Sequence, residues 1–168
     1  MVDANLIVTH DPSHAGSAKE GVENALKAIK QKAKFLKSDI EGIFMLRVGN
    51  AKKVTKSLNK LKSKKGMFEH THYWVPIEKW VSTNIKSIQK GVKKLQKGIK
   101  KTDKWKMDLH KRHFDMGSTE LIMVLTEVVD KPEVDLENPQ KIIEVQIIGK
   151  KAGLALLNKD ELLVVGNK

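Results

Sequence analysis

Short apolar runs that alternate with helix-type stripes constrain the fold of this chain more than any other feature. Buried residues recur about every 2 positions in a strand and about every 3.6 in a helix, so the two kinds of segment differ in the sequence. Residues 6–8, 43–48 and 73–75 form apolar runs typical of strands. Two stretches between them space their apolar residues three and four apart. The order β-α-β-α-β predicts a small ferredoxin-like sandwich over residues 1–80.

The two helices expected in this region each have a start or a stop signal. Ser17 is the predicted cap of the first helix, with Glu20 three residues later as its capping-box partner. Gly66 is the predicted end of the second helix. Each helix would bury one apolar stripe, made of Val22, Leu26, Ile29 and Ala33 in the first and of Val54, Leu58 and Leu61 in the second.

A second small unit is expected over residues 81–165, so the predicted fold class is α/β (α+β) with two units in tandem. Ser118 and Thr119 would cap a short helix that ends near Asp130. A longer helix comes first, and its apolar residues, spaced 3, 4, 3 and 4 apart, are Ile85, Ile88, Val92, Leu95 and Ile99. Strands are expected at residues 105–113, 142–148 and 154–157.

Charge is the second strong feature of the chain. The formal net charge is +12 and the isoelectric point is near 9.7, which favours a polyanionic partner such as nucleic acid. Residues 1–80 hold 15 basic and 8 acidic residues, whereas residues 114–168 hold 6 and 10. Residues 81–113 hold 11 basic and only 2 acidic residues. Three quarters of the surplus therefore comes from this middle segment.

Lysines decorate the polar side of the longer predicted helix. With a rise of about 1.5 Å per residue this helix would be roughly 27 Å long, so its lysines could follow several phosphates. Like charges three and four residues apart repel, which a purely structural helix would avoid by interleaving both signs. A merely solvated lysine-rich face is the alternative. The predicted RNA contacts on this helix are Lys86, Lys90, Lys93, Lys94, Lys97, Lys100 and Lys101.

Cations and aromatic residues alternate in the segment that follows. Lys104 and Lys106 flank Trp105, and the pair Lys111-Arg112 comes shortly before Phe114. Stacking on unpaired bases combined with phosphate contacts would use such a combination. Trp105 and Phe114 are also common core residues, so the aromatic part of this interpretation stays open.

Four segments together resemble the THUMP domain: 104–114, 118–122, 134–139 and 142–147. In that family a basic strand ending in Lys-Arg or a similar pair is followed by a helix, by a Val-Asp-Leu-x-x-Pro turn and by a terminal strand. The family usually has an acidic residue after this turn, where Gln140-Lys141 stands here. The segment Tyr73-Trp-Val-Pro-Ile77 before a long helix is similar to stand-alone THUMP proteins that assist tRNA cytidine acetylation.

The resemblance implies tRNA binding at the acceptor end and its unpaired 3′ terminus. It also implies an RNA acetyltransferase as partner, to which the chain would present tRNA for N4-acetylcytidine formation. The start of the helix at Ser118 could offer free backbone amides to a phosphate. On the basic strand, the contacts that the resemblance implies are Lys104, Lys106, Lys111 and Arg112.

The sequence predicts a non-catalytic protein that needs no cofactor. It has neither a glycine-rich loop typical of nucleotide cofactors nor a G-x-x-x-x-G-K-[ST] motif. Cysteine is absent, which excludes disulfides, thiolate zinc sites and cysteine nucleophiles. The pairs His70/His72 and His110/His113 are conceivable metal ligands, but exposed histidines are commoner and no metal is predicted. Neither a signal peptide nor a membrane span is recognised, so the expected location is the cytoplasm.

Two other functions fit the same features. A freestanding RNA-modifying enzyme with an unrecognised site would reveal itself by forming a modified product without a partner. A general RNA-binding or ribosome-associated protein would not distinguish mature tRNA from tRNA that lacks its 3′ end.

Overall fold

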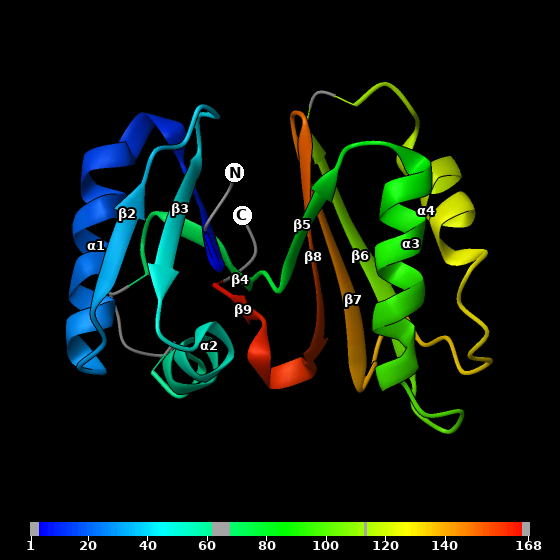
Figure 1. Ribbon diagram of the computed structural model, residues 1–168. Coiled ribbons are helices and arrows are strands. Elements are labelled where there is room, and N and C mark those ends of the chain that lie inside the picture. The colour runs from blue at the N-terminus through cyan, green and yellow to red at the C-terminus, as the bar shows by residue number, and fades with distance from the viewer. Residues whose placement is uncertain (1–3, 62–67, 113, 166–168) are drawn as a thin grey trace. The chain divides into compact units, whose positions relative to one another are not determined.

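The computed structural model describes residues 4–61, 68–112 and 114–165, and the chain divides into two compact units (Figure 1). The first unit comprises Met1–Ile77 together with Asp160–Lys168, and the second comprises Glu78–Lys159. The expected boundaries, 1–80 and 81–165, differ from this division because the C-terminal segment returns to the first unit. That return could not be seen in the sequence, since it depends on pairing between distant strands.

The first unit has the β-α-β-β-α-β order of a ferredoxin-like fold, which confirms the predicted class. All its strands are antiparallel, in the sheet order β2-β3-β1-β4-β9. Its elements are β1 (Leu6–His10), the 3-10 turn η1 (Pro12–His14), α1 (Ala15–Ala28), β2 (Ala33–Leu36), β3 (Ile43–Val48), α2 (Ala51–Asn59), β4 (Thr71–Pro76) and β9 (Leu163–Val164).

The predicted start and stripe of the first helix were partly wrong. Helix α1 begins at Ala15, ahead of Ser17, and no side chain caps it. It ends at Ala28, and Lys30, with φ of 55°, turns the chain into β2. Ala33 therefore lies in a strand that the sequence analysis missed. Helix α2 ends at Asn59, and its expected end at Gly66 lies outside the described residues.

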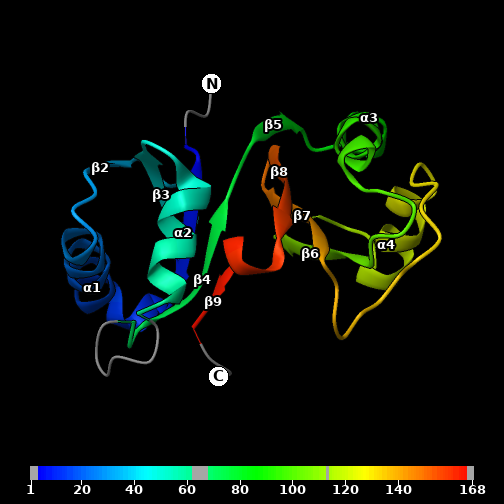
Figure 2. The ribbon, with the colours of Figure 1, turned by 90° about the horizontal axis from the view of Figure 1, so that it is seen from below.

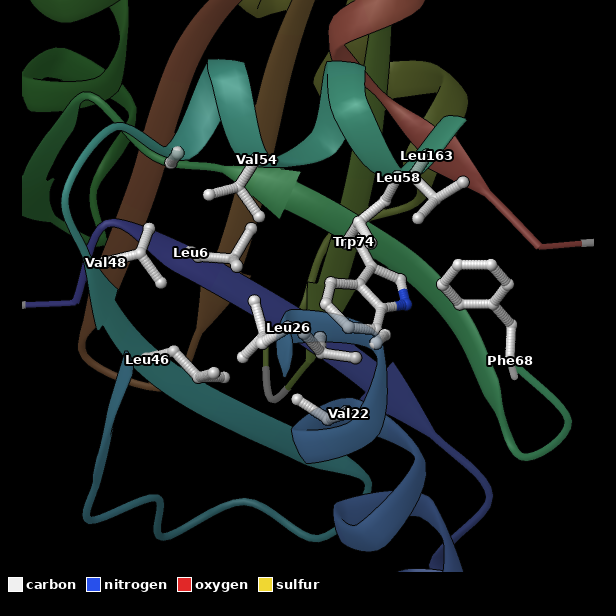
Figure 3. Packing of buried hydrophobic residues seen from close by; sticks show 13 residues of the cluster. Leu6, Val22, Leu26, Leu46, Val48, Val54, Leu58, Phe68, Trp74 and Leu163 are labelled. Atoms are coloured by element: carbon white, nitrogen blue, oxygen red, sulfur yellow. The ribbon is translucent and has the colours of Figure 1, made fainter. Parts of the chain in front are cut away.

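Both helices of the first unit cover the same face of its sheet. Figure 3 shows side chains of α1 and α2 meeting those of the strands around Trp74. The indole Nε1 of Trp74 donates a hydrogen bond to Thr71 Oγ1 at 3.1 Å, and the Phe68 ring meets it edge-on at 5.8 Å. The labelled core residues are Leu6, Val22, Leu26, Leu46, Val48, Val54, Leu58, Phe68, Trp74 and Leu163.

The second unit places its helices on one face of a mixed sheet with the order β5-β8-β7-β6 (Figure 2). Strands β6 and β7 run parallel, and the other neighbours are antiparallel. Its elements are β5 (Lys79–Ser82), α3 (Ile85–Leu95), the 3-10 turn η2 (Gln96–Gly98), β6 (Trp105–Arg112), α4 (Ser118–Thr126), β7 (Lys141–Ile148) and β8 (Lys151–Asn158). A further 3-10 turn, η3 (Lys159–Glu161), follows as the chain returns to the first unit.

The caps and lengths of the helices in the second unit also differ from the prediction. Gly117 is the N-cap of α4, and no side chain forms a capping hydrogen bond there. Ser118, the predicted cap, is the first residue of the helix. Helix α4 ends at Thr126, before Asp130. In the described residues, no helix is long and apolar enough to cross a membrane.

Alternation along β6 and β7 separates an apolar face from a polar face in this sheet. Met107, Val145 and Ile147 belong to the core that α3 and α4 cover. The neighbouring positions on the opposite face hold the side chains of Lys106, Asp108, His110, Arg112, Glu144 and Gln146.

Glu144 is the most unusual residue of the polar face, because its carboxyl group is fully buried. Its Oε1 accepts a hydrogen bond from Gln146 Nε2 at 2.8 Å and lies 3.7 Å from His110 Nε2. Its Oε2 has no hydrogen-bond partner among the described residues. Burial, followed by the charge of Asp108, which is paired with it in register, raises the pKa of Glu144 well above 4.5. Burial also lowers the pKa of His110.

We expect Glu144→Gln to raise the melting temperature at pH 8 but not at pH 4. A pKa that is higher in the folded state means that folding takes up a proton above pH 4.5, so stability is lost as the pH rises towards the folded pKa. Glutamine keeps the acceptor for Gln146 and removes the titration. Thermal melts of the variant and the wild type across this pH range measure the difference, with the exposed Glu137→Gln as control. A gain of the same size at both pH values would contradict the explanation.

Candidate nucleic-acid interface

Helix α3 carries exposed lysines on the side opposite its buried residues. Ile88, Gly91 and Val92 are buried. With a turn of about 100° per residue, the four lysines within α3 fall inside an arc of roughly 100° that is centred opposite this stripe. We call the exposed set that runs from α3 into η2 the α3 lysine face, and it consists of Lys86, Lys90, Lys93, Lys94 and Lys97.

Two residues that the sequence analysis missed fix the position of this face. Asn84 caps α3, because its Oδ1 accepts a hydrogen bond from the backbone N–H of Ser87 at 2.8 Å. At Gly91 a Cβ atom would overlap with Leu154 Cδ1, so any other residue there would force the Leu154 side chain or α3 to move. The signal available in the sequence was an asparagine directly before the helical stripe, a residue type common at helix N-caps. The partner of Gly91 is on a distant strand, and the sequence gave no sign of it.

The helix is shorter than expected. Helix α3 has 11 residues, which corresponds to about 16 Å instead of roughly 27 Å. It tightens into η2, and Ile99 is already extended with φ of −98° and ψ of 127°. Lys100 and Lys101 consequently lie in the following turn, where Asp103 Oδ2 accepts a hydrogen bond from the backbone N–H of Lys100 at 2.8 Å.

The ammonium groups of the α3 lysine face are not neutralised by the protein. In the part of the chain that the structure describes, no carboxylate forms an ion pair with any of these five lysines, nor with Lys100 or Lys101. Asp130 is bonded to Lys131 at 3.0 Å, and this contact, with a smaller contribution from the charge of Lys101, lowers the pKa of Asp130. The face therefore presents uncompensated positive charge, which a polyanion would neutralise with release of its counterions.

The cations of β6 do not share one surface, because the strand pleat sends alternate side chains to opposite faces. Lys106 lies on the polar face, with Nζ 3.0 Å from Asp108 Oδ1. Arg112 lies on the same face, donates from Nη1 to Gln146 Oε1 at 3.0 Å, and has its pKa lowered by burial. Lys111 points to the other face of the sheet and is half-buried.

The remaining predicted contacts are scattered over other elements. Lys104 is exposed just before β6, with Nζ 3.8 Å from Asp135 Oδ2. Ser118 is exposed at the start of α4. Trp105 is buried in the core and donates from Nε1 to Lys131 O at 3.1 Å, so it does not offer a base-stacking surface. Phe114 packs against the same core.

Five of the six histidines lie among the described residues. Within residues 4–61, 68–112 and 114–165, no group of three or more His, Asp or Glu side chains could hold an ion. The ring of His70 stacks on that of His14, with centroids 4.4 Å apart. His113 lies outside the described residues.

Solved structures with the same fold support the two-unit description. PH1313 from Pyrococcus horikoshii Ot3 is 15% identical and superposes with a TM-score of 0.62, covering 92% of this chain and 55% of that chain. TrmN from Thermus thermophilus is 13% identical, with a TM-score of 0.55 and coverages of 90% and 44%. The present chain thus spans about half the length of these proteins, and identities this low show the fold alone.

The sequence itself matches one known domain family. No curated protein sequence matches the chain. Residues 82–157, from the end of β5 into β8, match the THUMP domain, and this range contains α3, β6, α4 and β7. The second unit of this protein therefore contains a THUMP domain, and a ferredoxin-like unit precedes it.

Proposed function

We propose that this chain is a tRNA-binding adaptor that holds its substrate through the α3 lysine face. A THUMP domain implies RNA binding in tRNA modification. The observation that carries the proposal is the row of exposed lysines on α3, which faces away from the core and forms no ion pair with a carboxylate of the described residues. Neutralisation by RNA phosphates is the interaction that fits such a row.

The dimensions of the α3 lysine face suit a nucleic-acid backbone. A helix of about 16 Å is long enough to contact several successive phosphates of one RNA strand. Lysine contacts to phosphates position an RNA but carry no sequence information. Selection of tRNA would then depend on its shape and on its unpaired 3′ terminus, which the THUMP resemblance implies as the recognised end.

The cations of β6 make unequal contributions in this proposal. Lys104, just before β6, and Lys111 lie outside the α3 lysine face, and Lys104 is partly engaged by Asp135 whereas Lys111 is partly buried. Lys106 forms an ion pair with Asp108, and Arg112 donates a hydrogen bond to Gln146, so either residue could contact RNA only after its present interaction is broken. We therefore assign most of the affinity to α3 and not to β6.

The proposed partner is an RNA acetyltransferase that forms N4-acetylcytidine. Support comes from the segment 73–77, which resembles stand-alone THUMP proteins although the helix that follows is shorter than expected, and from a sequence without a recognised catalytic motif. Residues 114–168, with 10 acidic and 6 basic residues, would be kept off the phosphates and are available to the enzyme. We propose that the adaptor and its partner enzyme act in the cytoplasm.

Replacing Lys90, Lys93 and Lys94 together with glutamine should weaken tRNA binding at least about tenfold at 0.1–0.2 M salt (roughly physiological). Loss of up to three phosphate contacts should also make the log–log slope of affinity against salt less steep by about two to three. Fluorescence anisotropy with labelled tRNA over a salt series measures both quantities.

The matched control removes three exposed lysines of the first unit, which are Lys27 in α1, Lys32 in the loop before β2 and Lys53 in α2. Both triple variants lose the same net charge. Equal losses of affinity in the two would mean that overall charge governs binding, which would contradict a dedicated lysine face.

An adaptor should not modify RNA without its enzyme. Purified chain incubated with tRNA and acetyl-CoA, or with tRNA and S-adenosylmethionine, is expected to yield no modified nucleoside by mass spectrometry. Addition of an RNA acetyltransferase that copurifies with the chain should yield N4-acetylcytidine, and the triple lysine variant of α3 should reduce that yield. Product formation by the chain alone would refute the adaptor and favour a freestanding enzyme.

A further inference from the structure

The first unit has a hollow of about 340 Å³ beside the loop that joins β2 to β3. This loop and the start of α1 lie at the same end of the unit (Figure 1). The backbone N–H of His10, at the end of β1, donates to Gly42 O at 2.8 Å and fixes the loop against the sheet. Gly42 has φ of +82°, and a Cβ there would lie 3.2 Å from His10 O, so the loop needs glycine at this position. The hollow is therefore built on a defined backbone.

Three rings from three different strands line this hollow. The imidazole of His10 stacks on Phe44, with centroids 4.0 Å apart and planes 18° apart. Phe35 meets Phe44 edge-on at 5.6 Å and 82°. Both phenylalanines pack on the core with one part and remain half-exposed with the other. Aromatic surface is thus held open to solvent by packing behind it.

A cation completes the hollow. Lys19 on α1 lines it and holds its Nζ 5.0 Å from the centroid of the Phe35 ring. Its side chain is exposed, and no carboxylate among the described residues forms an ion pair with it. The lining also includes the exposed carboxylate of Glu41, so Lys19 is not its only charged group. Aromatic rings and an ammonium group without a carboxylate ion pair among the described residues together match the two parts of a nucleotide, the base and the phosphate. The size is at the lower end of the range for small-molecule sites, about 300–1,000 Å³, as expected for one nucleotide.

We propose that this hollow, the β2–β3 pocket lined by His10, Lys19, Phe35 and Phe44, takes one unpaired nucleotide of the bound RNA. The ammonium group of Lys19, which lies over the Phe35 ring in the structure, would move off this ring to contact a phosphate, and the base would stack on the phenylalanine rings. The proposal rests on the RNA-binding function above and extends it, because the α3 lysine face contacts only the backbone. Stacking does not depend on base identity, since every base has a π-face, so the pocket would recognise the absence of pairing and not a sequence.

The test compares two RNAs that differ only in an unpaired end. One is a blunt hairpin, and the other is the same hairpin with a four-nucleotide 3′ overhang. Phe35→Leu keeps an apolar side chain against the core but removes the stacking face. It should lower affinity for the overhang RNA by about 5- to 100-fold, the range expected for loss of one base stack, and leave affinity for the blunt hairpin unchanged. Phe68→Leu, a buried position away from the pocket, controls for loss of packing.

A second readout reports the contact itself. With 2-aminopurine in the overhang, wild-type protein should quench the fluorescence of the base on stacking, and Phe35→Leu and Phe44→Leu should each restore it. Lys19→Gln should weaken overhang binding while quenching persists at saturation. Melting temperatures of all variants verify that the first unit is folded.

The outcomes separate the pocket from the general function. Equal effects of Phe35→Leu on both RNAs, or no effect on either, would overturn the pocket while RNA binding through α3 stands. Wild-type protein that binds neither hairpin would overturn both proposals.

Discussion

The packing of α3 against β8 is the interaction on which the functional surface depends. Burial of Ile88 and Val92 stabilises the unit by about 1.5–3 kcal/mol for each side chain, whereas each pair of like charges on the outer side costs only a few tenths of a kcal/mol. Apolar burial thus outweighs the repulsion and holds the lysines in place before any RNA is present. Gly91 sets how closely the two elements approach, because a side chain there would overlap with Leu154. A packing contact in the core therefore determines where the charge is displayed.

The pleat of β6 gives basic residues in one short segment different roles. Lys106 and Arg112 face a buried carboxyl group and its neighbours, where they bond to Asp108 and Gln146. A buried charge without a partner is costly, and the raised pKa of Glu144 shows how the protein avoids that cost, since the protonated group carries no charge. These cations belong to the interior polar network of the sheet. The lysines of α3 form no ion pair with a carboxylate in the part of the chain that the structure describes, so their charge is available to a polyanion.

Much of the fold was predictable because its longer elements have regular apolar spacing. Strands β1, β3, β4, β6, β7 and β8 and the stripe of α3 were recognised from that spacing. Strand β2 was missed because Ala33 continues the helical stripe of α1, and β9 has only two residues, so only its pairing with β4 defines it. The lysines of α3 could be found from sequence, since one helix orders them. The β2–β3 pocket could not, because His10, Phe35 and Phe44 meet only after three strands have paired.

The phosphate contacts of α3 and the base contact in the β2–β3 pocket would contribute differently to RNA recognition. Phosphate contacts by α3 give an affinity that falls with salt and does not distinguish one RNA from another. A base held in the β2–β3 pocket would add little affinity alone, but it acts on an RNA that α3 has already brought to the same molecule, so its effective concentration is high. A weak contact that reports an unpaired nucleotide can therefore set the preference among RNAs that α3 binds equally well.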